Sequence, residues 1–165
     1  MKKGLRGLVM LSVCALSLAS CASKVSFADF KSKAGEAVKK TVEYTTATVS
    51  GSATTRSSDS KSEQKISANL KVNGRLITPA SLSDTPYAVI VNAFGITTYT
   101  VAERDGYTYY AGGSFKVTYE TKDDDGSKAS SSVEWNEFGL VTAIKAKGTG
   151  DNSKVTYNIT VKYSK

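Results

Sequence analysis

The stretch KVTYNITVKY, residues 154–163, alternates apolar and polar side chains without a break. Its odd-numbered positions are Val, Tyr, Ile, Val and Tyr, and its even-numbered positions are Lys, Thr, Asn, Thr and Lys. Successive side chains of a strand point to opposite faces, so the stretch predicts a β-strand with one apolar and one polar face. This pattern is typical of an antiparallel sheet that is packed on one side and wet on the other.

The same alternation recurs upstream, in KISANLKV (65–72) and FKVTYETK (115–122). Turn dipeptides such as Asn73-Gly74 and Asp105-Gly106 separate the strand-like segments. Because the connections are short, antiparallel neighbours should dominate. About eight strands are predicted, at 44–56, 65–72, 96–103, 107–111, 115–122, 130–136, 140–147 and 155–163.

Residues 26–38 predict a helix of three to four turns that packs on the sheet. Ser26 and Asp29 have the spacing of a capping box. The apolar residues behind them fall at helical spacing and form one stripe, made of Phe27, Phe30, Ala34, Ala37 and Val38.

A second short helix is predicted within SLSDTPYAVIVNAFG, residues 81–95. Asp84 or Thr85 is a candidate N-cap, and Gly95 is a candidate C-cap. Between them, apolar residues recur at i, i+3, i+4 and i+7, namely Tyr87, Ile90, Val91 and Phe94. The run AVIV taken alone would instead favour a strand, and the sequence leaves both open.

Residues 1–20 predict a secretory signal peptide. Lys2, Lys3 and Arg6 precede an apolar run, GLVMLSVCALSLA, that ends in small residues. The run is too short to cross a bilayer, which takes about 20 apolar residues.

Leu18-Ala19-Ser20-Cys21 resembles the lipobox of bacterial lipoproteins. The resemblance implies cleavage before Cys21 and a diacylglyceryl group on its thiol, which would anchor the chain to a membrane. The expected organisation is a signal peptide (1–20), a lipidated N-terminus with a short tether (21–26) and a single domain (27–165). An ordinary signal peptide cleaved near Ala22 is the alternative.

The residues after the cysteine bear on which membrane holds the anchor. They are Ala22 and Ser23, whereas an aspartate at this place retains lipoproteins at the inner membrane of enteric bacteria. We therefore expect the outer membrane in a cell with two membranes, and the outer face of the cell membrane in a cell with one.

Composition argues against several function classes. Loss of the leader lowers the formal net charge from +7 to +4, and the remaining cations form no arginine cluster, so no nucleic-acid partner is expected. The chain has no histidine, which removes Ser-His-Asp and Cys-His catalysis and the commonest metal ligand. Asp123-Asp124-Asp125 lacks the ligand spacing of an EF-hand loop. We expect no enzyme, catalytic residue, metal or cofactor, with a small hydrolase as a minor alternative.

The order of elements resembles the LolA/LppX lipoprotein-carrier fold. The resemblance lies in a helix after the lipobox, then VEYTTATVSG (42–51), a strand ending VNG (72–74), and the closing hairpins SSVEWNEFGLVTAIKAKG (131–148) and KVTYNITVKY. Members of that family are unclosed barrels whose apolar concave face, lidded by helices, holds lipid or acyl chains. We expect an α+β, mainly β fold: a curled antiparallel sheet, or half-barrel, with the N-terminal helix and the possible second one.

Two functions follow from this fold. The first is a membrane-anchored lipoprotein that binds a lipid or other hydrophobic ligand on the concave face of its sheet. The second is an interaction or structural lipoprotein of the cell envelope with a filled core and no ligand. For the first, the candidate ligand-binding residues are Ile66, Leu70, Tyr87, Ile90, Phe94, Tyr99, Phe115, Val117, Trp135, Ile144, Tyr157 and Ile159.

Overall fold

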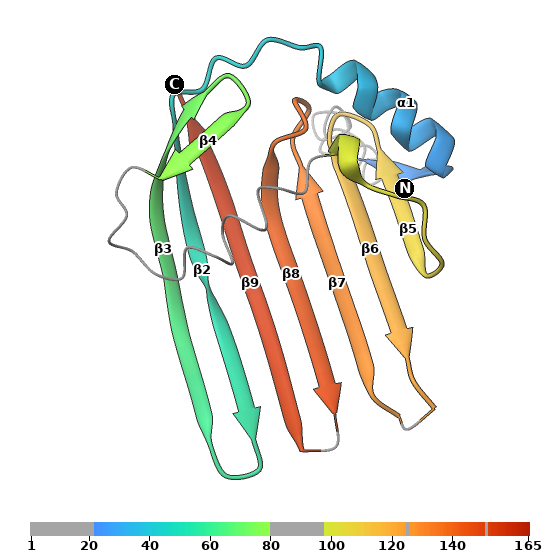
Figure 1. The fold of residues 1–165 in the computed structure, drawn as a ribbon, viewed down its shortest axis with the longest axis vertical. Helices are drawn as coiled ribbons and strands as arrows, with labels where there is room; N and C mark the ends of the chain where they lie inside the picture. The colour runs from blue at the N-terminus through green and yellow to red at the C-terminus, as the bar shows by residue number, and fades with distance from the viewer. Residues whose placement is uncertain (1–21, 80–97, 125, 151) are drawn as a thin grey trace, which may run out of the picture.

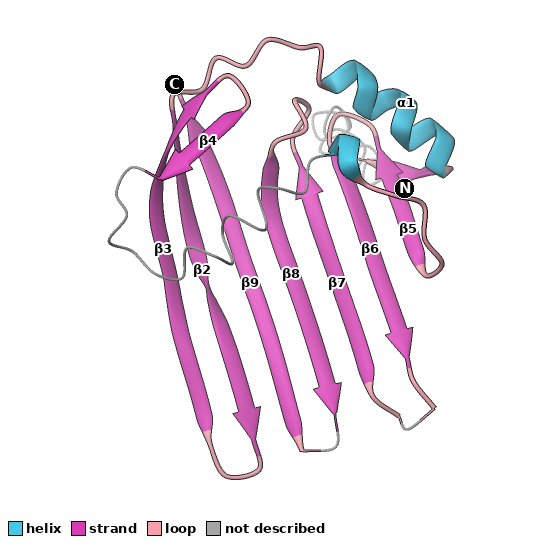
Figure 2. Cartoon of the chain, in the orientation of Figure 1, coloured by secondary structure: helices cyan, strands magenta, loops and turns pink. Residues whose placement is uncertain are grey.

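The computed structural model describes residues 22–79, 98–124, 126–150 and 152–165 as one open, half-barrel-like antiparallel sheet with a helix across one end (Figures 1 and 2). The predicted fold class is confirmed. The strands are β1 (Ser23–Val25), β2 (Thr46–Ser57), β3 (Lys61–Asn73), β4 (Leu76–Pro79), β5 (Tyr107–Ala111), β6 (Phe115–Lys122), β7 (Lys128–Trp135), β8 (Val141–Gly150) and β9 (Ser153–Ser164). The helices are α1 (Phe27–Ala37) and the 3₁₀ turn η1 (Thr98–Thr100).

The strand order is β1-β5-β6-β7-β8-β9-β2-β3-β4, and every pair is antiparallel. Most neighbours are joined by hairpins. The two exceptions are β1 beside β5 and the C-terminal strand β9 beside β2. The β2–β9 pair therefore joins the N-terminal and C-terminal hairpins into one sheet.

Alternation along each strand divides the sheet into two faces. We call the face that carries α1 the inner face and the opposite one the outer face. The KVTYNITVKY stretch lies in β9, where Ile159 and Val161 are buried on the inner face and their polar neighbours are exposed. The alternation predicted from the sequence is thus confirmed.

Helix α1 begins at the predicted cap. The Asp29 backbone N–H donates to Ser26 Oγ at 3.1 Å, and Ser26 Oγ donates to the Asp29 carboxylate at 2.8 Å. This arrangement satisfies a backbone donor that the first turn would otherwise leave free. The helix then buries Phe30, Ala34 and Ala37 of the predicted stripe against the sheet.

Apolar residues of the inner face form two clusters. The first lies under α1 and is centred on Phe30 and Trp135, which are 0% and 1% exposed. The Phe30 ring lies 5.7 Å from the ring of Phe115 and 6.4 Å from that of Trp135, centroid to centroid. The second cluster lies on β2, β3, β8 and β9 and comprises Ala47, Val49, Ile66, Leu70, Val72, Ile159 and Val161, with Ile144 packed against it.

Arg75, in the turn between β3 and β4, ties the end of α1 to the sheet. Its guanidinium donates to the carbonyls of Ala37 (2.7 Å), Val38 (3.1 Å) and Lys40 (3.0 Å), and also to the carbonyl of Phe138 in the β7–β8 turn. The last carbonyls of a helix have no intrahelical donors and carry partial negative charge, so a cation there is favourable. One side chain thus connects three segments that are distant in sequence.

The structure corrects the prediction of a strand at 96–103. Residues 98–100 form η1, and residues 101–104 are irregular. Strand β5 has β6 on one side and β1 on the other, so β1 occupies the edge that a hairpin with 96–103 would have needed. Thr98 and Val101 are buried instead of lying in a strand.

Two described strands were not predicted. β1 lies within the segment expected to be a tether, and β4 follows the Asn73-Gly74 turn. Both are short and lie at the sheet edges, where the alternation has too few residues to be recognised. The second helix predicted within 81–95 lies outside the described residues.

We predict that Gly51→Ala lowers the free energy of unfolding by about 1–3 kcal/mol. Gly51 lies on the inner face of β2 opposite Ile159 of β9, and a Cβ there would clash with the Asn158 carbonyl oxygen. Denaturant unfolding followed by the fluorescence of Trp135, the only tryptophan, measures the change. Gly148→Ala in β8 is the control, because its Cβ would meet nothing within 4 Å. Equal effects of the two variants would contradict the prediction.

We also predict that Arg75→Met costs about 1.5–3 kcal/mol of stability, the range for hydrogen bonds made by charged groups. The substitution removes the side-chain donor that the carbonyls of Val38 and Lys40 share with the Ala37 carbonyl, which also accepts from the Lys40 backbone N–H. Arg56→Met on the exposed end of β2 should keep stability or raise it slightly, because Arg56 lies opposite Lys61 and Lys154. The same unfolding measurement compares the two, and a cost at Arg75 no larger than at Arg56 would show that the clamp contributes nothing.

Candidate functional site

The candidate site is an apolar groove on the inner face, beside α1. It has a volume of about 350 Å³ and lies between β5–β7 and the segment that follows η1. Its lining residues are Thr100, Val101, Ala102, Arg104, Tyr107, Val117, Tyr119, Ser131, Val133 and Trp135.

The register of three strands builds the floor of the groove. Val117 of β6 lies opposite Val133 of β7, and Tyr119 lies opposite both Ser131 of β7 and Tyr107 of β5. The rings of Tyr107 and Tyr119 meet edge to face at 5.3 Å. The floor is therefore apolar at Val117 and Val133 and aromatic at Tyr107 and Tyr119.

Residues 101–104 form the wall of the groove, and Tyr109 holds them in place. Its hydroxyl donates to the Ala102 carbonyl at 3.0 Å and accepts from the Arg104 backbone N–H at 3.1 Å. The ring of Tyr109 packs on Phe27 and Phe30 of α1, with centroids 5.2 and 5.5 Å away. The wall is thus coupled to the helix. Arg104 is exposed and places a cation at the rim.

Of the predicted ligand-binding residues that the structure describes, two line this groove, Val117 and Trp135. Phe115 lies beneath α1 in the first cluster. Ile66, Leu70 and Ile159 belong to the second cluster, and Ile144 packs against both.

None of the remaining predicted residues is among the described residues that line the groove. Tyr157 is half-buried on the inner face, opposite Ala53 and Ala146. Cys21, Tyr87, Ile90 and Phe94 lie outside the described residues, as does the side chain of Tyr99.

Several groove residues were missed from the sequence. Tyr119 and Val133 continue the inward alternation of β6 and β7, so extending the predicted face by one position would have found them. Val101 had no such signal, because it was assigned to a strand that does not form, and Arg104 lies just after that predicted strand. The groove depends on where that segment returns over the sheet.

The polar groups that line the groove can make hydrogen bonds. The hydroxyls of the two tyrosines, the serine and Thr100 are neutral hydrogen-bonding groups, and Arg104 is the one charged residue among the described residues of the lining. Across the described part of the chain, no three His, Cys, Asp or Glu side chains come together in a way that could hold a metal ion. Within the same residues, no helix has the length and hydrophobicity needed to cross a membrane.

Comparison of the sequence with models of known protein families and with curated proteins gives no significant match.

Proposed function

We propose that the chain is a membrane-anchored bacterial lipoprotein that binds a lipid or other hydrophobic ligand in the inner-face groove. The lipobox-like sequence ending at Cys21 supports the anchor. The groove supports the ligand, because it is a concave, mainly apolar site with a few polar groups at its rim, as small-molecule sites usually are.

The size of the groove favours a slender ligand. Its volume of about 350 Å³ is at the low end of the range of ligand pockets, roughly 300–1,000 Å³. A single acyl chain or a small apolar molecule suits this space better than a lipid with several chains. Arg104 at the rim would pair with an acidic head group, such as a carboxylate.

A second candidate is an interaction or structural lipoprotein without a ligand. The observation that favours it is the filled space under α1, where Phe30, Ala34 and Trp135 are at most 1% exposed. In that case the groove would be a surface depression, and the ligand experiment below would find it empty.

We predict that Cys21→Ser abolishes lipid labelling and releases the protein from membranes. Acyl chains contribute about 0.8 kcal/mol per buried methylene, so two or three chains hold a protein on a bilayer almost permanently. Metabolic labelling with a fatty-acid analogue and membrane fractionation of the expressing bacterium measure both effects. Cys14→Ser, within the apolar run of the leader, is the matched control and should keep label and location. Persistent membrane attachment of Cys21→Ser would refute the anchor.

We further predict that the purified chain carries an acyl-containing molecule and that Ser131→Phe reduces its amount severalfold. Ser131 is exposed on the inner face and lines the groove, so a phenyl ring there would occupy the ligand volume. Ser132→Phe, on the adjacent outer-face position, should leave the amount unchanged.

Mass spectrometry of an organic extract measures the bound molecule, with the Cys21→Ser chain used so that anchor lipid does not contribute. An extract without any apolar molecule, together with no quenching of Trp135 fluorescence by added fatty acid, would favour the second candidate.

A further inference from the structure

The outer face of the sheet concentrates positive charge. On β2, β3 and β6–β9 it carries eleven Lys and Arg against three Glu, a formal charge of +8. The expected mature chain as a whole has only +4. The other described acidic residues lie in α1 and in loops, so the basic surface is that of the sheet itself. Asp59, Asp123 and Asp124 are in the β2–β3 and β6–β7 turns, directly beside the ends of these strands.

Five of these cations align in a single row across the strands. In register order the row is Lys122, Lys128, Thr149, Lys154, Arg56 and Lys61, on β6, β7, β8, β9, β2 and β3. We call it the cation row. Neighbouring strands lie about 4.8 Å apart, so the row is roughly 24 Å long. All five cations are exposed.

The cation row is unfavourable for folding. Like charges directly opposite one another on neighbouring strands are destabilising, and Lys122–Lys128, Lys154–Arg56 and Arg56–Lys61 are such pairs. Within the described residues, only Lys61 has a carboxylate within ion-pairing distance, Glu63 at 3.1 Å. Lysines can protect a sheet edge from aggregation, but β7, β9 and β2 are interior strands.

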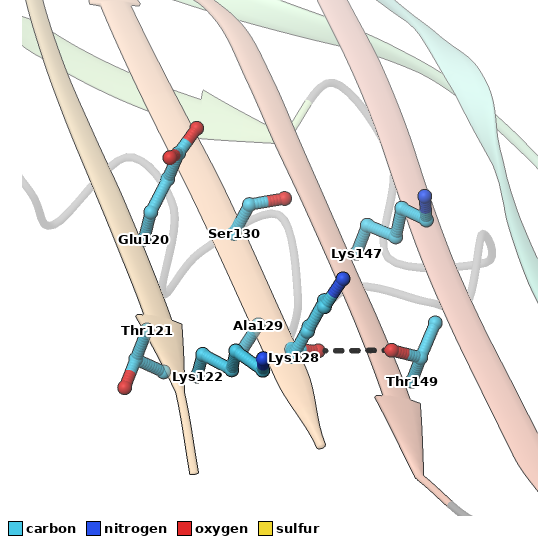
Figure 3. A pocket seen from close by; sticks show the side chains of 8 residues that line it. All are labelled: Glu120, Thr121, Lys122, Lys128, Ala129, Ser130, Lys147 and Thr149. Atoms are coloured by element: carbon cyan, nitrogen blue, oxygen red, sulfur yellow. Dashed lines mark hydrogen bonds between the residues drawn. The ribbon is translucent and has the colours of Figure 1, made fainter. Parts of the chain in front are cut away.

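The outer face is also hollowed beside the row. One hollow of about 420 Å³ is lined by Lys122, Lys128 and Lys147, with Glu120 as its one acidic residue (Figure 3). Ser130 and Thr149 add hydroxyl groups to it. A second hollow of about 410 Å³ shares Glu120, Ser130 and Lys147 and continues along β6–β9. Its outer-face lining residues include Lys145, Thr118, Ser132, Thr156 and Asn158.

We propose that this surface binds an acidic polysaccharide laid across the cation row. Ammonium groups at roughly strand spacing pair with carboxylate, sulfate or phosphate groups, and the hydroxyl and amide side chains between them suit sugar hydroxyls. Single-stranded nucleic acid fits less well, because base binding uses aromatic platforms and the outer-face positions of β6–β9 carry none.

The position of the row favours a polysaccharide over the membrane that would hold the anchor, and this step rests on the proposed lipidation. Cys21 lies two residues before β1, which pairs with β5 near α1. The row lies at the opposite end of the strands, where the β6–β7 and β8–β9 hairpins turn (Figure 1). Phe115 of β6 lies opposite β5, at the level of β1. The distance along β6 from Phe115 to Lys122 is about 23 Å. That exceeds two Debye lengths at physiological salt.

The test is binding of a heparin oligosaccharide, a model acidic polysaccharide, to the full chain held by its anchor in phosphatidylcholine vesicles. We expect binding at low ionic strength that weakens as salt is added. Combined Lys122→Gln, Lys128→Gln and Lys154→Gln should lower the affinity by roughly a hundredfold and flatten the salt dependence. The matched control, combined Lys24→Gln, Lys33→Gln and Lys39→Gln near α1, has the same change in charge and should lower it much less.

Several results would overturn the inference. They are absence of oligosaccharide binding at low salt, equal losses in the two triple variants, and displacement of the oligosaccharide by vesicles rich in phosphatidylglycerol, which would make the partner a lipid surface. Misfolding cannot mimic the expected result, since removing like charges should keep or raise the thermal midpoint of the Lys122/Lys128/Lys154 variant. If the chain is not lipidated, it stays in solution and does not bind the vesicles, which reveals a failure of the anchor. The two triple variants are then compared in solution.

Discussion

The structure depends on the need to cover one apolar face of an open sheet. A nine-stranded antiparallel sheet with alternating side chains presents a long apolar surface on one side, and within the described residues a single eleven-residue helix lies over it. Helix α1 covers the end formed by β5–β7, where Phe30 and Trp135 make a closely packed cluster. The groove lies beside this cluster, between β5–β7 and the described residues 100–104.

The position of α1 is fixed at both ends by polar contacts. Ser26 caps its N-terminus, and Arg75 donates to the carbonyls at its C-terminus. Burial lowers the pKa of the Arg75 guanidinium, yet arginine stays protonated at any ordinary pH, so the clamp does not depend on pH. Tyr109 adds a third link, since its ring packs on the helix while its hydroxyl holds residues 102 and 104. Helix, groove wall and sheet therefore behave as one packed unit.

What the sequence could predict follows from the range of the interactions involved. The Ser26 cap and the two faces of β9 arise from neighbours a few residues apart, so local pattern was enough to find them. The segment 96–103 has the composition of a strand, but whether it pairs depends on which segment takes the free edge of β5, and that edge went to β1. The groove could be predicted only in part for the same reason. Its floor follows from alternation in β6 and β7, whereas its wall is set by a long-range choice that the pattern does not encode.

Within the part of the chain that the structure describes, no helix packs on the outer face, unlike the inner one. A surface needed only for solubility would mix both signs of charge, which avoids repulsion between opposite strands. The outer face does contain a pair of opposite charges on neighbouring strands. Lys116 on β6 lies opposite Glu134 on β7, with 3.5 Å between the charged atoms. On the same two strands, Lys122 lies opposite Lys128. The fold accepts either arrangement, so it does not require the uniform sign of the cation row. Folding alone therefore does not explain the like-charge repulsion within the cation row.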